Sequence, residues 1–257
     1  MSDQEYKRAF RPLLPGVSHI TYNSVQELSH ITEKTACVII EPVQGEAGVI
    51  LPAGEYLKEL KKKCIETGTL LIFDEIQTGF GRCGKLFALE KYEVIPDILI
   101  LAKALGGGMP LGALVTSSEI MNYWQSNPVL GHITTFGGHP VSCAAALAAL
   151  KVLLREEWID LVEDKSLKIV NTLGKHPLVK EVRASGLLIA VDLGRREYAE
   201  SALWMLLEEG IMTDWFLFYP GAFRIAPPLC ITYKEIDYAL EKIVKVLDEI
   251  QKKDKNE

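Results

Sequence analysis

Two stretches decide the fold of this chain: LLIFDEIQTGFGRCGKLFALE at residues 70–90 and PDILILAKALGGG at residues 96–108. Each contains a short apolar run that ends next to a charged residue, Asp74 in the first stretch and Lys103 in the second. Apolar runs of this length, bounded by polar and glycine-rich segments, predict buried strands. In open α/β sheets, ligands bind beyond the carboxyl ends of the strands, so both residues are candidates for a site.

More strands and helices are predicted around these two runs. Residues 36–40 and 113–116 are short apolar runs that predict strands, the first of them buried. Apolar residues at helical spacing predict a helix at 56–66, which Gly68 ends. An alanine-rich segment predicts a long helix at about 141–154. Strands that alternate with helices indicate βαβ units, so we predict an α/β fold with a mainly parallel sheet.

The pattern changes after residue 155. We predict a large domain at residues 1–155 and a smaller α+β domain at residues 156–257. Residues 1–35 are expected to be irregular, because two prolines and a glycine at positions 12–16 oppose an early helix, and residues 251–257 to form a frayed tail. The elements expected in the smaller domain are a helix at 158–173, strands at 179–182 and 187–193, a helix at 198–209, short strands near 211 and at 223–225, and a final helix at 234–250.

Composition excludes several classes of function. The 257 residues carry a formal net charge of −6, which disfavours nucleic acid as a partner. The first residues are polar and unlike a signal peptide, and the longest small apolar stretch, 143–150, is far short of the roughly 20 residues that span a bilayer. We therefore expect a cytoplasmic protein without membrane contact. The five cysteines are scattered, and neither they nor the histidines have the spacing of metal ligands, so no metal site is expected.

The pair of Asp74 and Lys103 suggests a Schiff-base site. A lysine is usually a solvated surface charge, and an aspartate at a strand end is common. Lys103, however, lies between an apolar strand and three glycines, where partial desolvation would lower its pKa and make the amine a nucleophile for an aldehyde cofactor. Asp74 would face the ring nitrogen of that cofactor, and Ile76, two residues further on the same side, would pack on the ring.

Two glycine motifs do not predict nucleotide binding. Residues 79–84 fit G-x-G-x-x-G, but four residues separate them from Asp74 at the strand end, and Arg82 lies inside the motif. Residues 106–110 lack the Gly-Lys-Ser/Thr of a P-loop. We therefore expect no nucleotide site in either segment.

Arg224 lies between apolar residues in FRIAPP, an expensive place for a charge unless it is paired or binds a carboxylate. Glu46 is a possible partner when no substrate is bound. The hydroxyls of Thr134 and Thr135, in a loop before the long helix, could reach a phosphate, although a plain loop is the alternative interpretation.

Together these motifs resemble the class III pyridoxal-phosphate aminotransferases of the ornithine and acetylornithine type, which have the type I aspartate-aminotransferase fold. Their order and spacing match over almost the whole chain. The matching segments are EPVQGEAGV (41–49), LLIFDEIQTGFGRCGKLFALE (70–90), PDILILAKALGGGMPLGA (96–113), TTFGGHP (134–140) and FRIAPPL (223–229).

The resemblance implies a role for each residue of the cofactor site. Lys103 is expected to form the Schiff base with pyridoxal 5'-phosphate and to move the proton from the substrate Cα. Asp74 is expected to pair with the pyridine nitrogen, Gln77 to hydrogen-bond the phenolic oxygen, and Ile76 to pack on the ring. Thr135 resembles the threonine that reaches the cofactor phosphate of the neighbouring subunit, so a homodimer is implied.

The substrate side follows from the same resemblance. Arg224 resembles the arginine that binds the α-carboxylate of 2-oxoglutarate, and Glu46 resembles its switching partner. Thr134 is also expected on the substrate side. The implied reaction is transfer of an amino group from an amino acid or ω-amine to a 2-oxo acid.

One departure leaves alternatives open. Members of the family carry a further N-terminal portion, about a third of their length, before the segment that begins here. That portion supplies the cradle for the cofactor phosphate and the aromatic residue stacked on its ring, and residues 1–35 contain no substitute. The chain is therefore predicted to be an aminotransferase, with an inactive or partner-requiring fragment, or an aminomutase or decarboxylase of the same family, as the alternatives.

Overall fold

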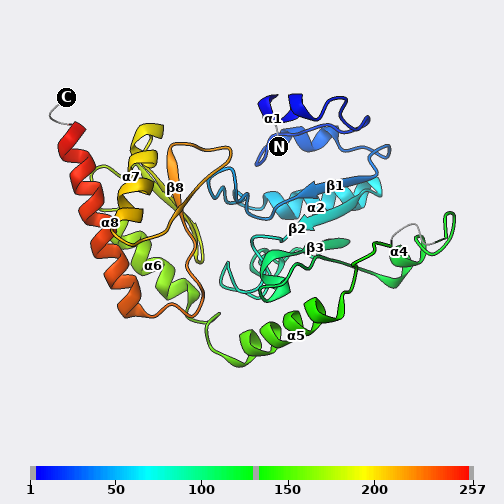
Figure 1. Ribbon diagram of the computed structural model, residues 1–257. Coiled ribbons are helices and arrows are strands. Elements are labelled where there is room, and N and C mark those ends of the chain that lie inside the picture. The colour runs from blue at the N-terminus through cyan, green and yellow to red at the C-terminus, as the bar shows by residue number, and fades with distance from the viewer. Residues whose placement is uncertain (1–3, 130–132, 255–257) are drawn as a thin grey trace.

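The computed structural model describes residues 4–129 and 133–254, which form two β-sheets with their covering helices (Figure 1). The elements up to the long connecting helix are α1 (Gln4–Ala9), η1 (Gln26–His30), β1 (Cys37–Ile40), α2 (Tyr56–Thr67), β2 (Leu70–Asp74), α3 (Ala88–Tyr92), β3 (Ile98–Leu101), η2 (Lys103–Gly106), β4 (Ala113–Thr116), α4 (Ser118–Asn122) and α5 (Pro140–Arg155). Those that follow are α6 (Val162–Leu173), β5 (Glu181–Ser185), β6 (Leu188–Asp192), α7 (Arg196–Glu208), β7 (Asp214–Trp215), β8 (Ala222–Ile225) and α8 (Tyr233–Asp254).

The first sheet has the strand order β1-β2-β3-β4. The strands β1, β2 and β3 are parallel, and β4 is antiparallel to β3. Asp74 lies opposite Ile100 in the pairing of β2 with β3, so β2 ends close to the point where β3 runs into Lys103. The predicted α/β fold with a mainly parallel sheet is confirmed.

Helix α2 covers the first sheet with one apolar face. Its residues Leu57 and Leu60 join Leu71 and Phe73 of β2 in a single buried cluster. Leu60, Leu71 and Phe73 are fully buried, and each such side chain contributes about 1.5–3 kcal/mol relative to an exposed one. The helix ends as predicted at Gly68, whose φ of +68° is a left-handed conformation that glycine adopts without strain.

The second sheet is antiparallel, in the order β5-β6-β8-β7. Helices α6, α7 and α8 pack beside it in Figure 1. Strand β6 is buried along its whole length. Ile189 and Val191 belong to a cluster separate from that of α2 and β2, whereas Leu188 and Ala190 pack with Val43 and Val49 in a third cluster between the two parts of the chain. The largest fully buried side chains of the cluster that contains Val191 are Leu173, Leu187, Ile189, Leu206, Phe223, Ile236 and Leu247.

Several expected elements differ from the observed ones. The prediction that residues 1–35 are irregular is wrong for residues 4–9, which form α1. The prolines at positions 12 and 15 lie after this short helix and not within it. Strand β1 is not buried: Ile39 is 63% exposed, because β1 is the edge of the sheet in this chain. Helix α8 continues to Asp254, so the expected tail is helical over most of its length. Helices α3 and α4, of five residues each, were not predicted.

The smaller elements also shift. Helix α6 begins at Val162 instead of residue 158, and the strand expected near residue 211 is the two-residue β7 at Asp214–Trp215. Within the described ranges, the structure has no helix that is both long enough and apolar enough to cross a membrane.

Candidate active site

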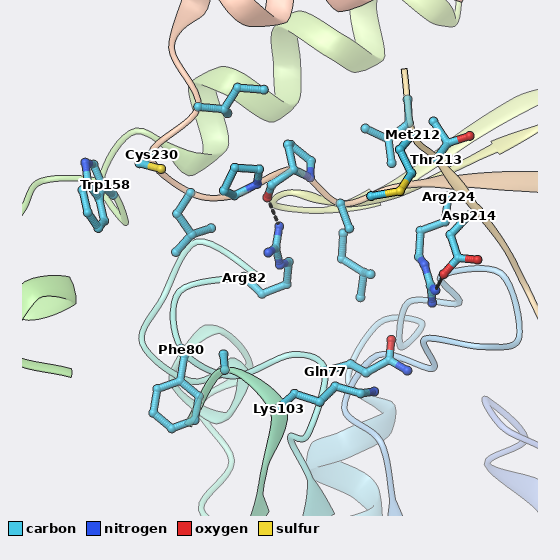
Figure 2. A pocket seen from close by; sticks show the side chains of 18 of the residues that line it. Gln77, Phe80, Arg82, Lys103, Trp158, Met212, Thr213, Asp214, Arg224 and Cys230 are labelled. Carbon is cyan, nitrogen blue, oxygen red and sulfur yellow. Dashed lines mark hydrogen bonds and ion pairs between the residues drawn. The ribbon is translucent and has the colours of Figure 1, made fainter. Parts of the chain in front are cut away.

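A cavity of about 1220 Å³ lies between the two sheets. Figure 2 shows Lys103 and Gln77 on one side of it and Arg224 with Asp214 on another. Ile76 and Glu46 also line it, so five of the predicted site residues meet around one space: Glu46, Ile76, Gln77, Lys103 and Arg224. A volume of this order accommodates a cofactor together with a small substrate.

Lys103 is separated from the end of β3 by Ala102 alone and begins the short helix η2. Its φ of +48° is a left-handed conformation, which is uncommon for a residue with a side chain and clusters at functional sites. Partial burial, as the largest cause, together with the charge of Arg224, holds the pKa of the Lys103 amine below its ordinary value. The carboxylates of Glu46, Asp74 and Glu41 act in the opposite direction. A larger share of this amine is therefore neutral, and able to act as a nucleophile, than of an ordinary lysine.

Asp74 and Ile76 lie at the end of β2. The Asp74 carboxylate accepts a hydrogen bond of 3.0 Å from the backbone N–H of Ile76. Ile76 lines the cavity, whereas Asp74 does not, although its charge is close enough to act on Lys103. Pairing of Asp74 with a ring nitrogen therefore stays a prediction.

Glu46 and Arg224 form the predicted pair across the cavity. Nη1 of Arg224 lies 2.7 Å from the Glu46 carboxylate, which also accepts hydrogen bonds from the Gln77 side chain at 2.9 Å and from the backbone N–H of Leu217 at 3.2 Å. Burial raises the pKa of Glu46, but the hydrogen bonds from Gln77 and Arg224 outweigh it, and the pKa lies below its usual value. Glu46 is therefore an ionised carboxylate that faces Arg224 in the cavity.

Asp214 is a further residue at this pair, and the motifs did not reveal it. Its carboxylate contacts Nη2 of Arg224, and the Arg224 guanidinium also lies over the Phe216 ring, 5.5 Å from its centre. Asp214 belongs to a strand of two residues, which has no hydrophobic pattern to detect. Only the pairing of β7 with β8 places it opposite Arg224.

The two threonines do not join the cavity of this chain. Thr134 and Thr135 are exposed and lie in the loop before α5, outside the cavity lining. Their assignment to a substrate or to a phosphate stays a prediction.

Glu75 has a structural role that alternation along the strand could have indicated. It points away from the cavity and is fully buried, where its carboxylate accepts hydrogen bonds from the backbone N–H groups of Ala88 at 2.6 Å and Leu89 at 2.8 Å and from the Thr78 hydroxyl at 3.1 Å. Unsatisfied N–H groups at a helix start need such acceptors. Glu75 therefore fixes the start of α3 and the turns that lead to it.

Arg82 lies in the G-x-G-x-x-G segment and connects the two sheets. It donates hydrogen bonds to the backbone carbonyls of Leu187 at 3.0 Å and Pro227 at 2.6 Å, the second of which Figure 2 marks. No helix opens after these glycines until Ala88, which agrees with the rejection of a nucleotide fingerprint.

A second contact between the sheets holds the loop that carries Glu46. Nε of Arg183 on β5 donates a 2.7 Å hydrogen bond to the carbonyl of Gly48. Arg183 is itself held by the buried Asp192 at 2.9 Å, and Asp192 accepts a hydrogen bond of 2.6 Å from Tyr219. The loop is thus fixed to the second sheet at Gly48, two residues after Glu46.

Comparison with known proteins agrees with this geometry. The chain is 42% identical over 255 residues to the ornithine aminotransferase of Geobacillus sp. (strain WCH70), covering 95% of this chain and 61% of that protein. The ornithine aminotransferase of Toxoplasma gondii superposes with a TM-score of 0.91 at 34% identity, over 99% of this chain and 61% of that one. That structure has partial occupancy of pyridoxal phosphate at its active site.

A third relative is the acetylornithine aminotransferase of Elizabethkingia anophelis, with a TM-score of 0.83 and 34% identity over 96% of this chain and 62% of that one. The chain therefore spans about three fifths of the length of these relatives. The sequence model of the family Aminotransferase class-III matches residues 1–247. This match covers nearly the whole chain and includes Lys103, Arg224 and Glu46, which line the cavity. The chain therefore belongs to the class III aminotransferases.

Proposed function

We propose that this chain carries the lysine and carboxylate-binding side of a pyridoxal-phosphate-dependent aminotransferase site. The reaction moves an amino group from an amino acid or ω-amine to a 2-oxo acid such as 2-oxoglutarate. The observation that carries the proposal is that one cavity contains both the Lys103 amine and the Arg224–Glu46 ion pair. A nucleophilic amine can hold an aldehyde cofactor, and an arginine whose carboxylate partner can be displaced can bind the carboxylate of a 2-oxo acid.

The residues fit the reactive end of pyridoxal phosphate, which when bound supplies an electron sink next to the substrate amine. Lys103 would hold its aldehyde carbon, Ile76 its ring face and Gln77 its phenolic oxygen, with Asp74 at the ring nitrogen. For the phosphate, Arg82 is the remaining cation among the described lining residues, and backbone carbonyls already occupy it. The exposed Thr135 of a second copy is our candidate for that role.

Lys103 and Arg224 have separate tasks in the proposed reaction. The neutral Lys103 amine would accept the proton of the substrate Cα and would carry it to the cofactor side, a role that its lowered pKa favours. Glu46 leaves Arg224 when a 2-oxo acid enters, so that the guanidinium binds the incoming carboxylate in two-pronged geometry.

We also propose that the chain acts in a cytoplasmic homodimer and has two domains, at residues 1–155 and 156–257. Two sheets, each with a buried cluster of its own, support the division, and a third cluster that contains Val43 and Leu188 joins the two parts. The edge position of β1 and the exposed threonine loop support a site that further polypeptide completes. These two observations favour the partner-requiring fragment as the second candidate.

Borohydride reduction of the purified chain with added pyridoxal phosphate, followed by peptide mass mapping, tests the proposal. We expect a pyridoxyl adduct at Lys103 that Lys103→Ala abolishes. Lys85→Ala is the matched control, because Lys85 is exposed and outside the cavity. Labelling spread over many lysines, or unchanged by Lys103→Ala, would contradict the proposal.

A second assay separates the alternatives. Glutamate and a panel of amines are supplied with 2-oxoglutarate, and amino transfer is measured beside carbon dioxide release and isomerisation of the donor. Transfer alone supports the aminotransferase. An adduct and activity that appear only after addition of a polypeptide covering the rest of the relatives' length would identify the partner-requiring fragment.

A further inference from the structure

Two carboxylates hold Arg224 from different sides. Nη1 of Arg224 lies 2.7 Å from Glu46, and Nη2 contacts Asp214. The guanidinium is planar and presents its donors in a fixed fork, so these two contacts together set the plane of the group. Arg224 is 16% exposed, which leaves little space for it to find water as a replacement partner.

Asp214 lies on a strand, whereas Glu46 lies in a loop. Asp214 lies directly opposite Arg224 in the antiparallel pairing of β7 with β8, where facing side chains are about 5 Å apart at Cβ. Its other oxygen accepts a 2.9 Å hydrogen bond from the backbone N–H of Trp215. Glu46, by contrast, reaches Arg224 from a loop of the other sheet, across the cavity. Glu46 is therefore the partner that can leave without disturbing a strand.

When Glu46 moves away, Asp214 is the carboxylate that still holds the orientation of the Arg224 guanidinium. A guanidinium that loses one of its two carboxylates can rotate away from the incoming ligand unless the other contact persists. We propose that Asp214 is a positioning residue, which keeps Arg224 directed into the cavity while the carboxylate of a 2-oxo acid replaces Glu46. This inference rests on the proposed function, because it concerns the acceptor side of the same site.

The negative charge of Asp214 also repels an anionic ligand, so the two effects must be compared. The Asp214 side chain is 50% exposed, and water and salt screen its action on a ligand beyond the arginine. Its contact with Arg224 is direct and charge-assisted, which is the stronger kind of hydrogen bond. Orientation therefore outweighs repulsion, and removal of Asp214 weakens binding of the 2-oxo acid.

Calorimetric titration of the purified chain with 2-oxoglutarate, without cofactor, measures this effect. We expect Asp214→Ala to raise the dissociation constant about tenfold, the loss of one charge-assisted hydrogen bond, and Asp214→Asn to raise it about threefold. Asp214→Glu should restore most of the affinity. Glu208→Ala is the matched control, because this exposed carboxylate of α7 lies outside the cavity, and it should leave the constant unchanged.

A second measurement separates positioning from a general loss of structure. The side-chain Nε–Hε resonance of Arg224, assigned by its absence in Arg224→Lys, should be sharp in the unaltered chain. It should broaden on removal of Asp214, while the circular dichroism of the protein stays the same.

An equal or lower dissociation constant for both Asp214→Ala and Asp214→Asn would overturn the inference, as would an unaltered chain that does not bind 2-oxoglutarate. The proposed function has its own readout in the Lys103 adduct. An adduct without an effect of Asp214 would refute the inference alone, and an effect of Asp214 without an adduct would refute the cofactor proposal alone.

Discussion

Substitution of the buried Glu75 by alanine should strongly destabilise the first sheet. The carboxylate accepts three hydrogen bonds, from the backbone N–H groups of Ala88 and Leu89 and from the Thr78 hydroxyl. Thr78 is 1% exposed and Ala88 is fully buried, so water cannot replace the lost acceptor at these two donors. The Leu89 N–H lies nearer the surface, where water can reach it.

The expected loss follows from these contacts. Two buried donors without acceptors cost about 4 kcal/mol together, and the missing helix cap about 1 kcal/mol. Removal of the carboxylate also regains about 2 kcal/mol, because a polar group no longer has to be buried. Glu75→Ala should therefore lower the free energy of unfolding by about 3 kcal/mol, a large share of the roughly 5–15 kcal/mol that stabilises an ordinary domain.

Urea denaturation followed by circular dichroism provides the assay. Glu90→Ala is the matched control: Glu90 accepts a 2.9 Å hydrogen bond from Phe87 at the same helix start, but it is exposed. It should cost less than about 1 kcal/mol. Glu75→Gln keeps one acceptor oxygen and should fall between the two. Equal losses for Glu75→Ala and Glu90→Ala would refute the argument that burial of the donors sets the cost.

Three further changes test the site loop and the acid stability. Gly45→Ala would place a Cβ 2.6 Å from Oε1 of Gln77 and displace it, so pyridoxyl labelling should fall several-fold, whereas the free energy of unfolding should change by less than about 1 kcal/mol. Unchanged labelling would contradict this. Gly48→Ala combines a φ of +96° with a Cβ 3.0 Å from the Tyr219 ring, and should cost roughly 2 kcal/mol in urea denaturation; a loss near zero would show that the loop adapts. Two lysines of α8 lower the pKa of Glu209 to about 2, so its stabilisation is complete above the unfolded value of 4.5 and is lost as the pH falls toward 2. Melting temperatures measured from pH 7 to pH 2 should therefore fall less steeply for Glu209→Gln, and parallel curves would disprove the assignment.

Local patterns in the sequence were sufficient to predict the strands β2 and β3 and the position of Lys103. The runs that became β2 and β3 are apolar over their whole length and end at polar residues, so Lys103 could be identified as a residue at a strand end. Arg224 could be expected to need a partner, because a charge between apolar residues requires one, and the resemblance to the family supported Glu46 in that place. The strand end before Lys103 and the unpaired charge at Arg224 are both patterns that lie within a few neighbouring residues.

What could not be predicted depends on residues far apart in the chain. Helix α3 has five residues and starts where Glu75, thirteen positions earlier, accepts its N–H groups. Asp214 reaches Arg224 only through the register of a two-residue strand. The exposure of Ile39 depends on which strands flank β1, and the apolar run that contains it cannot reveal that.

The bonds of Arg82 across the two sheets have a consequence for sequence divergence. Its acceptors are the main-chain carbonyls of Leu187 and Pro227, which every amino acid provides. Relatives can therefore exchange the side chains at these two positions without losing the connection, whereas a change at position 82 that removes Nη1 removes both bonds at once. We therefore expect the hydrogen bonds between the two sheets to be present in homologues whose second sheet differs in sequence. They depend on the side chain of one residue, Arg82, in the first part of the chain.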